Sequence, residues 1–510
     1  MQIAIAGLEW SFYGPRHAVA MTGRDETRRK CNWLIHVNRR AVRVASNIGP
    51  DIRWIVSLSA LAHGAFVFSG LLLYVLVTRI GRQRRHPSAA FAWVLTIAVI
   101  PYIGIPLFLL FGARKLVRPH RPDHPSFPLD ADQAGPVWAT RLLAVLAAPP
   151  QTHNQMVRFH EDGLASQRAV LTLIEQARQR IDLCTFILGD DALGNALVAA
   201  MVKSAQGGVR IRVLLDRIGG LRCARSQLRA MRDVGIDVRW FMPLLHTPLH
   251  AHINLRNHRK LVVCDGESLW SGGRNFASEY FTGSQGHSAW LDLSFVVTGP
   301  LASQAALLFE CDWRAAAGNA HSISFGRPPA ATGSLAQLVP SGPDYADDTV
   351  YALLLTAAYQ AQQKIVAVTP YFVPDEALLG AWCMACRRGV RVILLIPVRS
   401  NHRLADWARE RALRDLCLAG AEVYLFPAML HAKAVIIDDD LALCGSANLD
   451  GRSLFLNFEL MTAFYGRTEI QWLTAWAMRY VQQSDRYEAQ EPSWWRDLIE
   501  GIVRVVGFQL

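Results

Sequence analysis

Lysine is scarce in this sequence: only six of the 53 basic residues are lysine, and arginine supplies the rest. The six are Lys30, Lys115, Lys203, Lys260, Lys364 and Lys433. A planar guanidinium suits bidentate clamps on carboxylates or phosphates, whereas a compact ammonium fits against a single phosphoryl oxygen in a tight site. Lys260 and Lys433 occupy the same place in two matching motifs. Lysine in a chain that otherwise uses arginine indicates a geometric requirement there.

A disulfide framework is also lacking. The nine cysteines are odd in number and scattered, and a chain of 510 residues needs no covalent staples, so we expect free thiols in a reducing compartment. Cys383 and Cys386 form one C-x-x-C, but no second pair or neighbouring histidine completes a zinc site. No carboxylate cluster suggests a divalent cation. The sequence therefore predicts neither a metal nor another cofactor.

Formally charged residues are absent from two long stretches, residues 54–78 and 89–112. At about 1.5 Å per residue, a helix over the first can cross a hydrocarbon core of about 30 Å. The second contains Pro101, Gly104 and Pro106 and could span with a kink or re-enter. Buried core helices are the alternative, but they rarely run beyond about 18 apolar residues without a polar face. We expect a transmembrane hairpin.

These features divide the chain into six predicted segments. They are a basic extension (1–50), the transmembrane hairpin (51–115), a linker rich in proline (116–165), two similar domains (166–325 and 326–490) and a C-terminal amphipathic helix (491–510). The last could lie on the membrane surface or pack against the preceding domain. By the positive-inside rule, the arginine-rich flanks of the hairpin favour a cytoplasmic location for the N-terminus and the large C-terminal region.

The net charge of +11 favours anionic partners, either nucleic acid or acidic membrane lipids. Two membrane segments and the lack of a tract that combines basic and aromatic residues argue against nucleic acid. We therefore expect a membrane-embedded protein whose partners are anionic lipids. The oligomeric state is not indicated.

An internal duplication fills the C-terminal two thirds of the chain. A helix, strand, helix, strand pattern over residues 174–216 recurs over 358–397, and each copy is followed by a glycine and an alternating strand, at 233–241 and 418–426. Alternating helices and strands predict α/β layers in each half. We expect two similar domains about a pseudo-twofold axis, with the reaction site between them.

The motif H-x-K-x4-D-x6-G-x-x-N occurs once in each half. The first copy runs from His258 (HRKLVVCDGESLWSGGRN) and the second from His431 (HAKAVIIDDDLALCGSAN). Side chains two residues apart point to the same face of a strand, so each histidine projects beside its lysine, Lys260 or Lys433. Two imidazoles and two ammonium groups that face each other across a domain interface suit one phosphodiester.

The aspartates of the motif, Asp265 and Asp438, follow each lysine by five residues, near the strand end. We count them as candidate catalytic residues beside the histidines and lysines. A role in capping a turn or in supporting the catalytic groups is equally compatible with their position.

Four downstream residues complete the candidate site. Asn275 and Asn448 would donate side-chain hydrogen bonds to a bound phosphate, and the preceding glycines would let the backbone approach it. Glu279 and Glu459 could orient a histidine ring and support its protonated form.

The chain resembles the phospholipase D superfamily, whose duplicated HxKxxxxD motifs define its fold, and within it the bacterial cardiolipin synthases. The resemblance rests on the motifs and on the phrases AWVLTIAVIPYIGIPLFLLFG, NLRNHRK, GGRNFASEY, WLDLSFVVTGP, FECDW, TPYFVPD and GSANLDGRSLFLNFE. It implies two α/β/α sandwich domains in a multi-pass protein of the bacterial inner membrane. Gly273, where many members have serine, and the first 50 residues depart from the pattern.

The resemblance also implies a reaction. A phosphatidyl group would pass between two phosphatidylglycerol molecules, with His258 as nucleophile and His431 as acid and base, to give cardiolipin and glycerol through a phosphohistidine. The motifs themselves do not identify the acceptor alcohol. A phospholipase D, another phosphatidyltransferase or, with less support, a phosphodiesterase or nuclease on the same scaffold are the alternatives.

Overall fold

A computed structural model describes residues 50–80, 87–112, 135–241, 255–284, 286–317, 332–345, 347–496 and 500. The predicted basic extension lies outside these residues except for Pro50, and so does most of the predicted C-terminal helix. The chain separates into two units, residues 1–69 and 70–510. The second unit contains all of the predicted site residues.

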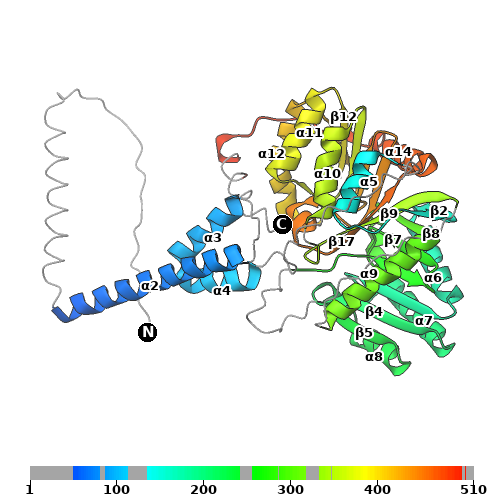
Figure 1. Ribbon diagram of the computed structural model, residues 1–510, viewed down its shortest axis with the longest axis horizontal. Coiled ribbons are helices and arrows are strands. Elements are labelled where there is room, and N and C mark those ends of the chain that lie inside the picture. Colours follow the sequence, from blue (N-terminus) through cyan, green and yellow to red (C-terminus); the bar gives the residue numbers. More distant parts are fainter. Residues whose placement is uncertain are drawn as a thin grey trace. The chain divides into compact units, whose positions relative to one another are not determined.

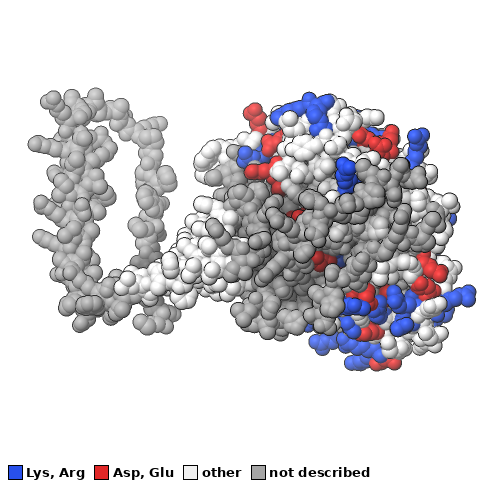
Figure 2. Space-filling model, viewed as in Figure 1, with Lys and Arg blue, Asp and Glu red and all other residues white. Residues whose placement is uncertain are grey.

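The first apolar stretch forms one long helix, α2 (Pro50–Ile80). Its segment Ala60–Thr78 is, among the described residues, the one that is long and apolar enough to cross a membrane. Many of its side chains face outward, as Leu61 and Phe68 do. Figure 2 shows the described part of α2 to α4 in white, without charged side chains.

The second apolar stretch does not form a single helix long enough to cross a membrane. It breaks into two short helices, α3 (Pro87–Val99) and α4 (Pro101–Phe111), which are only about 20 Å and 16 Å long. They run antiparallel, because Gly104 abuts the α3 backbone and the rings of Trp93 and Phe108 lie 5.4 Å apart. A proline cannot donate the hydrogen bond that would continue α3. The predicted multi-pass hairpin is therefore not supported.

Residues 135–496 contain two large mixed sheets (Figure 1). The first has the order β2-β8-β7-β6-β3-β4-β5. Its strands are β2 (Met156–His160), β3 (Arg180–Thr185), β4 (Arg210–Asp216), β5 (Asp237–Phe241), β6 (Leu261–Cys264), β7 (Ser268–Gly272) and β8 (Ser294–Thr298).

The second sheet has the order β1-β9-β17-β15-β14-β10-β12-β13-β18. Its strands are β1 (Thr152–Asn154), β9 (Ser334–Ser341), β10 (Lys364–Val368), β12 (Arg391–Pro397), β13 (Glu422–Phe426), β14 (Ala434–Ile437), β15 (Leu441–Gly445), β17 (Glu459–Phe464) and β18 (Asp485–Arg486). A separate small sheet pairs β11 (Phe372–Val373) with β16 (Leu449–Asp450).

Six strands repeat in the same order in both sheets: β8-β7-β6-β3-β4-β5 in the first and β17-β15-β14-β10-β12-β13 in the second. In each, the last three strands are parallel and the others antiparallel. The predicted duplication of an α/β unit is confirmed.

Helices cover both faces of each sheet. The outer face of the first sheet packs on α6 (Gly163–Gln176), α7 (Ala192–Gln206) and α8 (Arg225–Asp233), and that of the second on α10 (Thr349–Gln360), α11 (Glu376–Arg387) and α12 (Arg403–Leu418). A third core combines residues of both sheets with α9 (Pro300–Ala316) and α14 (Arg467–Val481). This shared core joins the two halves.

Part of the predicted linker belongs to the folded halves. Helix α5 (Val137–Val145) buries Ala139 and Leu143 in the core of the second half. The next two strands separate: β1 pairs with β9 in the second sheet, and β2 pairs with β8 in the first. Strands of three and five residues at sheet edges show too little alternation to be recognised from sequence.

Candidate active site

The two His-x-Lys motifs directly precede β6 and β14. Strand β6 pairs antiparallel with β3, and β14 with β10. The first residue of each motif strand lies opposite the end of its partner: Leu261 opposite Cys184, and Ala434 opposite Val368. The motifs therefore lie at the edge where the parallel strands end. In open α/β sheets this is the edge that binds ligands.

The backbones of the two halves meet at the motifs. An isolated bridge joins Asn257 to Phe458, and another joins Leu430 to Leu291. The amide of His258 donates to the Phe458 carbonyl at 2.8 Å, and the amide of the second motif histidine donates to the Leu291 carbonyl at 2.6 Å. Each motif is therefore beside a carboxylate of the opposite half: Glu459, the first residue of β17, or Asp292, two residues before β8.

Asp292 accepts a hydrogen bond from Nδ1 of His431 over 2.6 Å, and both side chains are buried. Burial raises the pKa of Asp292, but His431, Lys433 and Arg274 outweigh it and lower that pKa to about 2. Asp292 is therefore ionised at neutral pH. It fixes the tautomer of His431 and leaves Nε2 as the nitrogen that exchanges protons.

Glu459 takes the equivalent place beside His258, at 3.5 Å from Nδ1. It is fully buried and accepts from the Ser446 hydroxyl at 2.6 Å. Burial raises the pKa of Glu459 to about 7, against the charge of Lys260. Burial and then Lys260 hold the pKa of His258 well below its usual value, so His258 is neutral. Its side chain is 22% exposed against 9% for the other motif histidine.

Both lysines lie against their own motif histidines. Lys260 donates to the backbone carbonyl of His258 at 2.7 Å. Lys433 contacts the ring of His431, 2.8 Å from Nδ1, and also its backbone carbonyl. Burial lowers the pKa of both lysines, that of Lys433 to about 7. Their ammonium groups give the site its positive charge.

Asn275 and Asn448 occupy equivalent positions and are both buried. Among the described residues, the side-chain oxygen of each lacks a hydrogen-bond partner. Asn275 contacts Tyr280, whose ring lies 4.9 Å from that of His431, and Asn448 contacts Asp450. A buried amide oxygen without a partner costs free energy, so these oxygens are placed to accept a hydrogen bond from a donor group of a ligand, such as a hydroxyl.

Among the described residues, the ion-pair partner of Glu279 is not a histidine. Glu279 forms an ion pair with Arg222 at 2.5 Å. The residue that matches Glu459 is instead Asp292. In the first half, Gly272 of the motif pairs with Ser294, two residues after Asp292; in the second half, Gly445 pairs with Met461, two residues after Glu459. Sequence reasoning missed Asp292, although the phrase WLDLSFVV places it just ahead of an apolar strand.

Asp265 and Asp438 lie at the other end of the motif strands, about 16 Å beyond the lysines. Asp265 accepts from the backbone amides of residues 178–180, each at 2.8 Å, and Asp438 from those of residues 362–364 at 2.8 to 2.9 Å. Both have positive φ angles, 55° and 50°. The structure thus separates them from the histidines and gives them the capping role.

A family model described as "Cardiolipin synthase, PLD-like domain" matches residues 170–313 and 354–481, more than half of the chain. The chain belongs to the cardiolipin synthases. A second model, "Phospholipase_D-nuclease N-terminal", matches residues 70–112, which are the end of α2 with α3 and α4. In this member of the cardiolipin synthase family, each of the two matched domains contains its own His-x-Lys motif.

Curated relatives agree with this assignment. Cardiolipin synthase A of Pseudomonas putida (strain W619) is 31% identical over 395 residues, which cover 74% of this chain and 82% of the relative. The major cardiolipin synthase ClsA of Bacillus subtilis (strain 168) is 30% identical over 442 residues, 81% of this chain and 91% of the relative. The solved phosphatidylserine synthase of Haemophilus influenzae Rd KW20 shares the fold, with a TM-score of 0.60, 16% identity, and coverage of 73% of this chain and 100% of that one.

Proposed function

We propose that this protein transfers a phosphatidyl group from one phosphatidylglycerol to another, forming cardiolipin and releasing glycerol. The observation that carries the proposal is the crossed pairing of the two halves, in which Asp292 holds His431 and Glu459 holds His258. This pairing gives one site with two imidazoles in different environments. The cardiolipin synthases among the relatives support the choice of substrate.

In the first half-reaction, neutral His258 attacks phosphorus of the donor lipid. A nitrogen–phosphorus bond forms, and the bond from phosphorus to the oxygen of the headgroup glycerol breaks. His431 delivers the proton that this leaving glycerol needs. We assign His258 as the nucleophile because its side chain is the more exposed of the two, and it is neutral, as attack on phosphorus requires. Lys260 and Lys433 stabilise the charge on the phosphoryl oxygens.

The proton on His431 depends on the bound substrate. In the free enzyme, burial and Lys433 lower the pKa of His431 to about 4, against the opposing effect of Asp292. A bound phosphodiester anion raises the pKa of both His431 and Lys433, because it offsets their positive charges. The two groups are 2.8 Å apart and titrate as a pair. The bound substrate thus favours the charged form of the acid.

In the second half-reaction, the headgroup hydroxyl of another phosphatidylglycerol attacks the phosphohistidine. His431, now neutral, accepts the hydroxyl proton, the new oxygen–phosphorus bond forms and the bond to His258 breaks. Both histidines return to their starting states. Water in place of the lipid alcohol would give phosphatidic acid, the product of a phospholipase D.

Three further parts of the proposal concern the arrangement of the chain. The halves, residues 166–325 and 326–490, are related by a pseudo-twofold axis, which the shared strand order and the two equivalent bridges support. Helix α2 anchors the protein in the bacterial inner membrane. Its partners are phosphatidylglycerol and other anionic lipids, and not nucleic acid.

Product analysis tests the function. The full chain in membranes receives phosphatidylglycerol with one label in the headgroup glycerol and another in the acyl chains. We expect equal amounts of cardiolipin and free glycerol, and neither product from the His258→Asn variant. Phosphatidic acid as the sole lipid product would show that water is the acceptor and would overturn the synthase assignment.

A further inference from the structure

Two loops extend from the edge of the sheets that carries the active site. The first, residues 217–224, follows β4 and contains the 3-10 helix η1 (Gly219–Arg222). The second, residues 398–402, follows β12 and leads into α12. Because β4 and β12 run parallel to β3 and β10, their loops emerge at the edge where the His-x-Lys motifs lie.

The first loop contacts groups that surround both histidines. Gly219 packs directly on the backbone of Phe186, whose ring lies 4.2 Å from that of His258. Arg222 pairs with Glu279, the residue directly before the tyrosine that packs on the other motif histidine. This loop therefore forms one border of the active site.

The second loop forms another border. Asn401 accepts a hydrogen bond from the Tyr371 hydroxyl at 2.5 Å. Burial raises the pKa of Tyr371, and so does the nearby Tyr280, which is in ring contact with His431. Tyr371 thus connects the loop to the active site.

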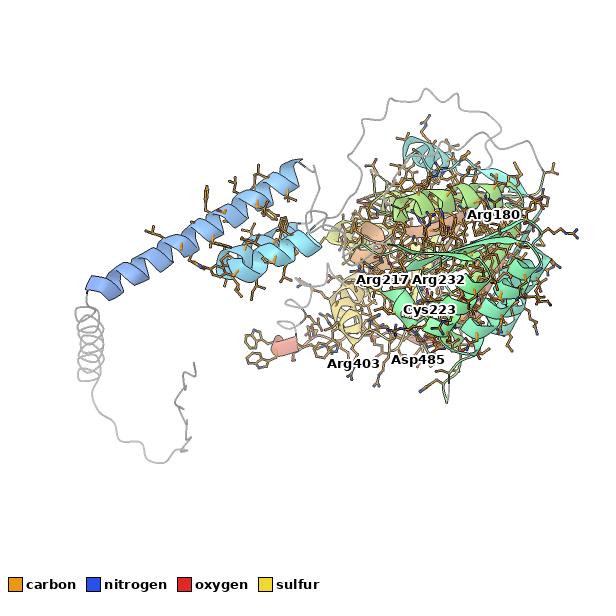
Figure 3. All side chains as sticks on the ribbon, turned by 90° about the horizontal axis from the view of Figure 1, so that it is seen from below. Arg180, Arg217, Cys223, Arg232, Arg403 and Asp485 are labelled. Carbon is orange, nitrogen blue, oxygen red and sulfur yellow. The ribbon has the colours of Figure 1, made fainter. Side chains whose placement is uncertain are left out.

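Large apolar side chains are exposed on both loops and on the start of α12. We call these the rim: Ile218 (43% exposed), Leu221 (69%), Val398 (39%), Leu404 (58%) and Trp407 (57%). Residues 217–225 and 398–405 contain arginine at positions 217, 222, 225, 399 and 403 and no aspartate or glutamate. Asp406, which directly precedes Trp407, forms an ion pair with Arg409. Figure 3 labels Arg217, which directly follows β4, and Arg403, the first residue of α12.

The C-terminal segment adds two more exposed tryptophans beside α12. Trp494 and Trp495 are 68% and 66% exposed. The following Arg496 pairs with Glu410 at 3.1 Å, one helical turn after the rim residue Trp407. Ion pairs thus fix the segment against α12 while its indoles remain in solvent. Tryptophan is enriched where proteins meet the interface of a bilayer.

We propose that the rim docks on the surface of an anionic bilayer, so that phospholipid enters the active site directly from the membrane. This inference rests on the proposed function. Exposed apolar side chains flanked by arginine match a surface of acyl chains and phosphate headgroups. A protein partner would need complementary acidic and apolar groups, whereas the bilayer already contains the substrate.

The test compares membrane-bound with monomeric substrate for the full-length protein in detergent. Leu221→Ser combined with Leu404→Ser alters the rim, and Leu418→Ser is the matched control, because Leu418 is 82% exposed at the other end of the same helix. Each protein is assayed with long-chain phosphatidylglycerol in vesicles and with a short-chain phosphatidylglycerol dissolved as monomers.

We expect the rim variant to lose about tenfold in rate on vesicles, because part of the transfer free energy of two leucines is lost, and to keep its rate on monomers. The control variant should have the same rate as the unchanged protein on vesicles and on monomers. Arg403→Gln should weaken vesicle binding about fivefold, and less at high salt. Equal vesicle rates for rim variant and control would overturn the proposal, as would an equal loss on monomers or a change of oligomeric state.

Hydrogen exchange separates this inference from the proposed function. If the unchanged protein made no cardiolipin from either substrate, the proposed function would fail. Docking would still predict slower amide exchange in residues 217–224 and 398–407 in nanodiscs of phosphatidylglycerol than in nanodiscs of phosphatidylcholine. Identical exchange in the two would refute docking.

Discussion

Asp292 and His431 are 139 positions apart in the chain and belong to different halves, yet a 2.6 Å hydrogen bond joins them. Glu459 stands in the same relation to His258. Each half therefore supplies the carboxylate for the other half's histidine. Neither half contains a complete site, which ties catalysis to the packing of the interface.

The roles of the two histidines can be separated with an activated donor. A phosphatidyl ester of p-nitrophenol has a leaving group that needs no proton, so formation of the phosphohistidine no longer requires the acid. His431→Asn should then release a burst of about one p-nitrophenolate per enzyme, and His258→Asn none. Stopped-flow absorbance measures the burst. A burst from His258→Asn alone would reverse the assignment.

Asp292→Asn should lower the rate on phosphatidylglycerol by roughly 10²- to 10⁴-fold, because the amide cannot fix the tautomer of His431 or stabilise its charged form. Glu279→Gln is the control, since Glu279 faces Arg222. Its loss should stay well below tenfold. Steady-state rates on both variants, with circular dichroism to verify folding, decide the matter. The reverse order of effects would restore Glu279 to the site.

The dependence of kcat/KM on pH should show an alkaline limb near pH 7. Burial lowers the pKa of Lys433 to about 7, so the free enzyme loses this ammonium as the pH rises through that value. The bound phosphate anion raises the same pKa, so kcat should fall only at higher pH. Rates between pH 5 and 10 test this. A flat kcat/KM from pH 6 to 9 would contradict the assignment.

Asp265→Asn and Asp438→Asn should destabilise the fold by about 1 to 3 kcal/mol each, because each carboxylate accepts three backbone hydrogen bonds. Asparagine tolerates the positive φ, so the change tests the charge. The variants should unfold at lower temperature but remain active when cold. Complete loss of activity in folded variants would return these residues to the catalytic group.

The stability that Asp265 contributes should depend on pH. Burial raises the pKa of Asp265, but hydrogen bonds from backbone amides outweigh this effect and lower the pKa below its usual value. Its contribution to stability is therefore present above the unfolded pKa of about 3.9, and is lost as the pH falls through the lower folded value. Chemical unfolding of the unchanged protein and Asp265→Asn at pH 7 and at acidic pH should show the difference shrinking at low pH.

Membrane topology should reflect one crossing. Helices α3 and α4 are too short to span separately, so residues 50 and 135 should lie on opposite sides of the membrane. Protease treatment of oriented vesicles should cleave either an N-terminal epitope tag or the catalytic region, and not both. Cleavage of both from the same side would require a second crossing.

The sequence by itself determined the duplication, the two His-x-Lys pairs and the long apolar helix. Each is encoded locally, in a strand period, in a spacing of a few residues or in a run without charge. The family resemblance followed from the same local patterns. These features did not depend on how distant segments pack.

Only the tertiary structure decided which carboxylate serves which histidine. Glu279 is closer in sequence to His258 than Asp292 is, yet it turns to Arg222, while Asp292 crosses to the other half. The sequence also left three other features undecided. These are the roles of Asp265 and Asp438, the pairing of β1 and β2 with different sheets, and the fold of residues 87–112. Each depends on contacts between segments far apart in the chain, and a pattern of neighbouring residues contains no information about which distant partner is nearest.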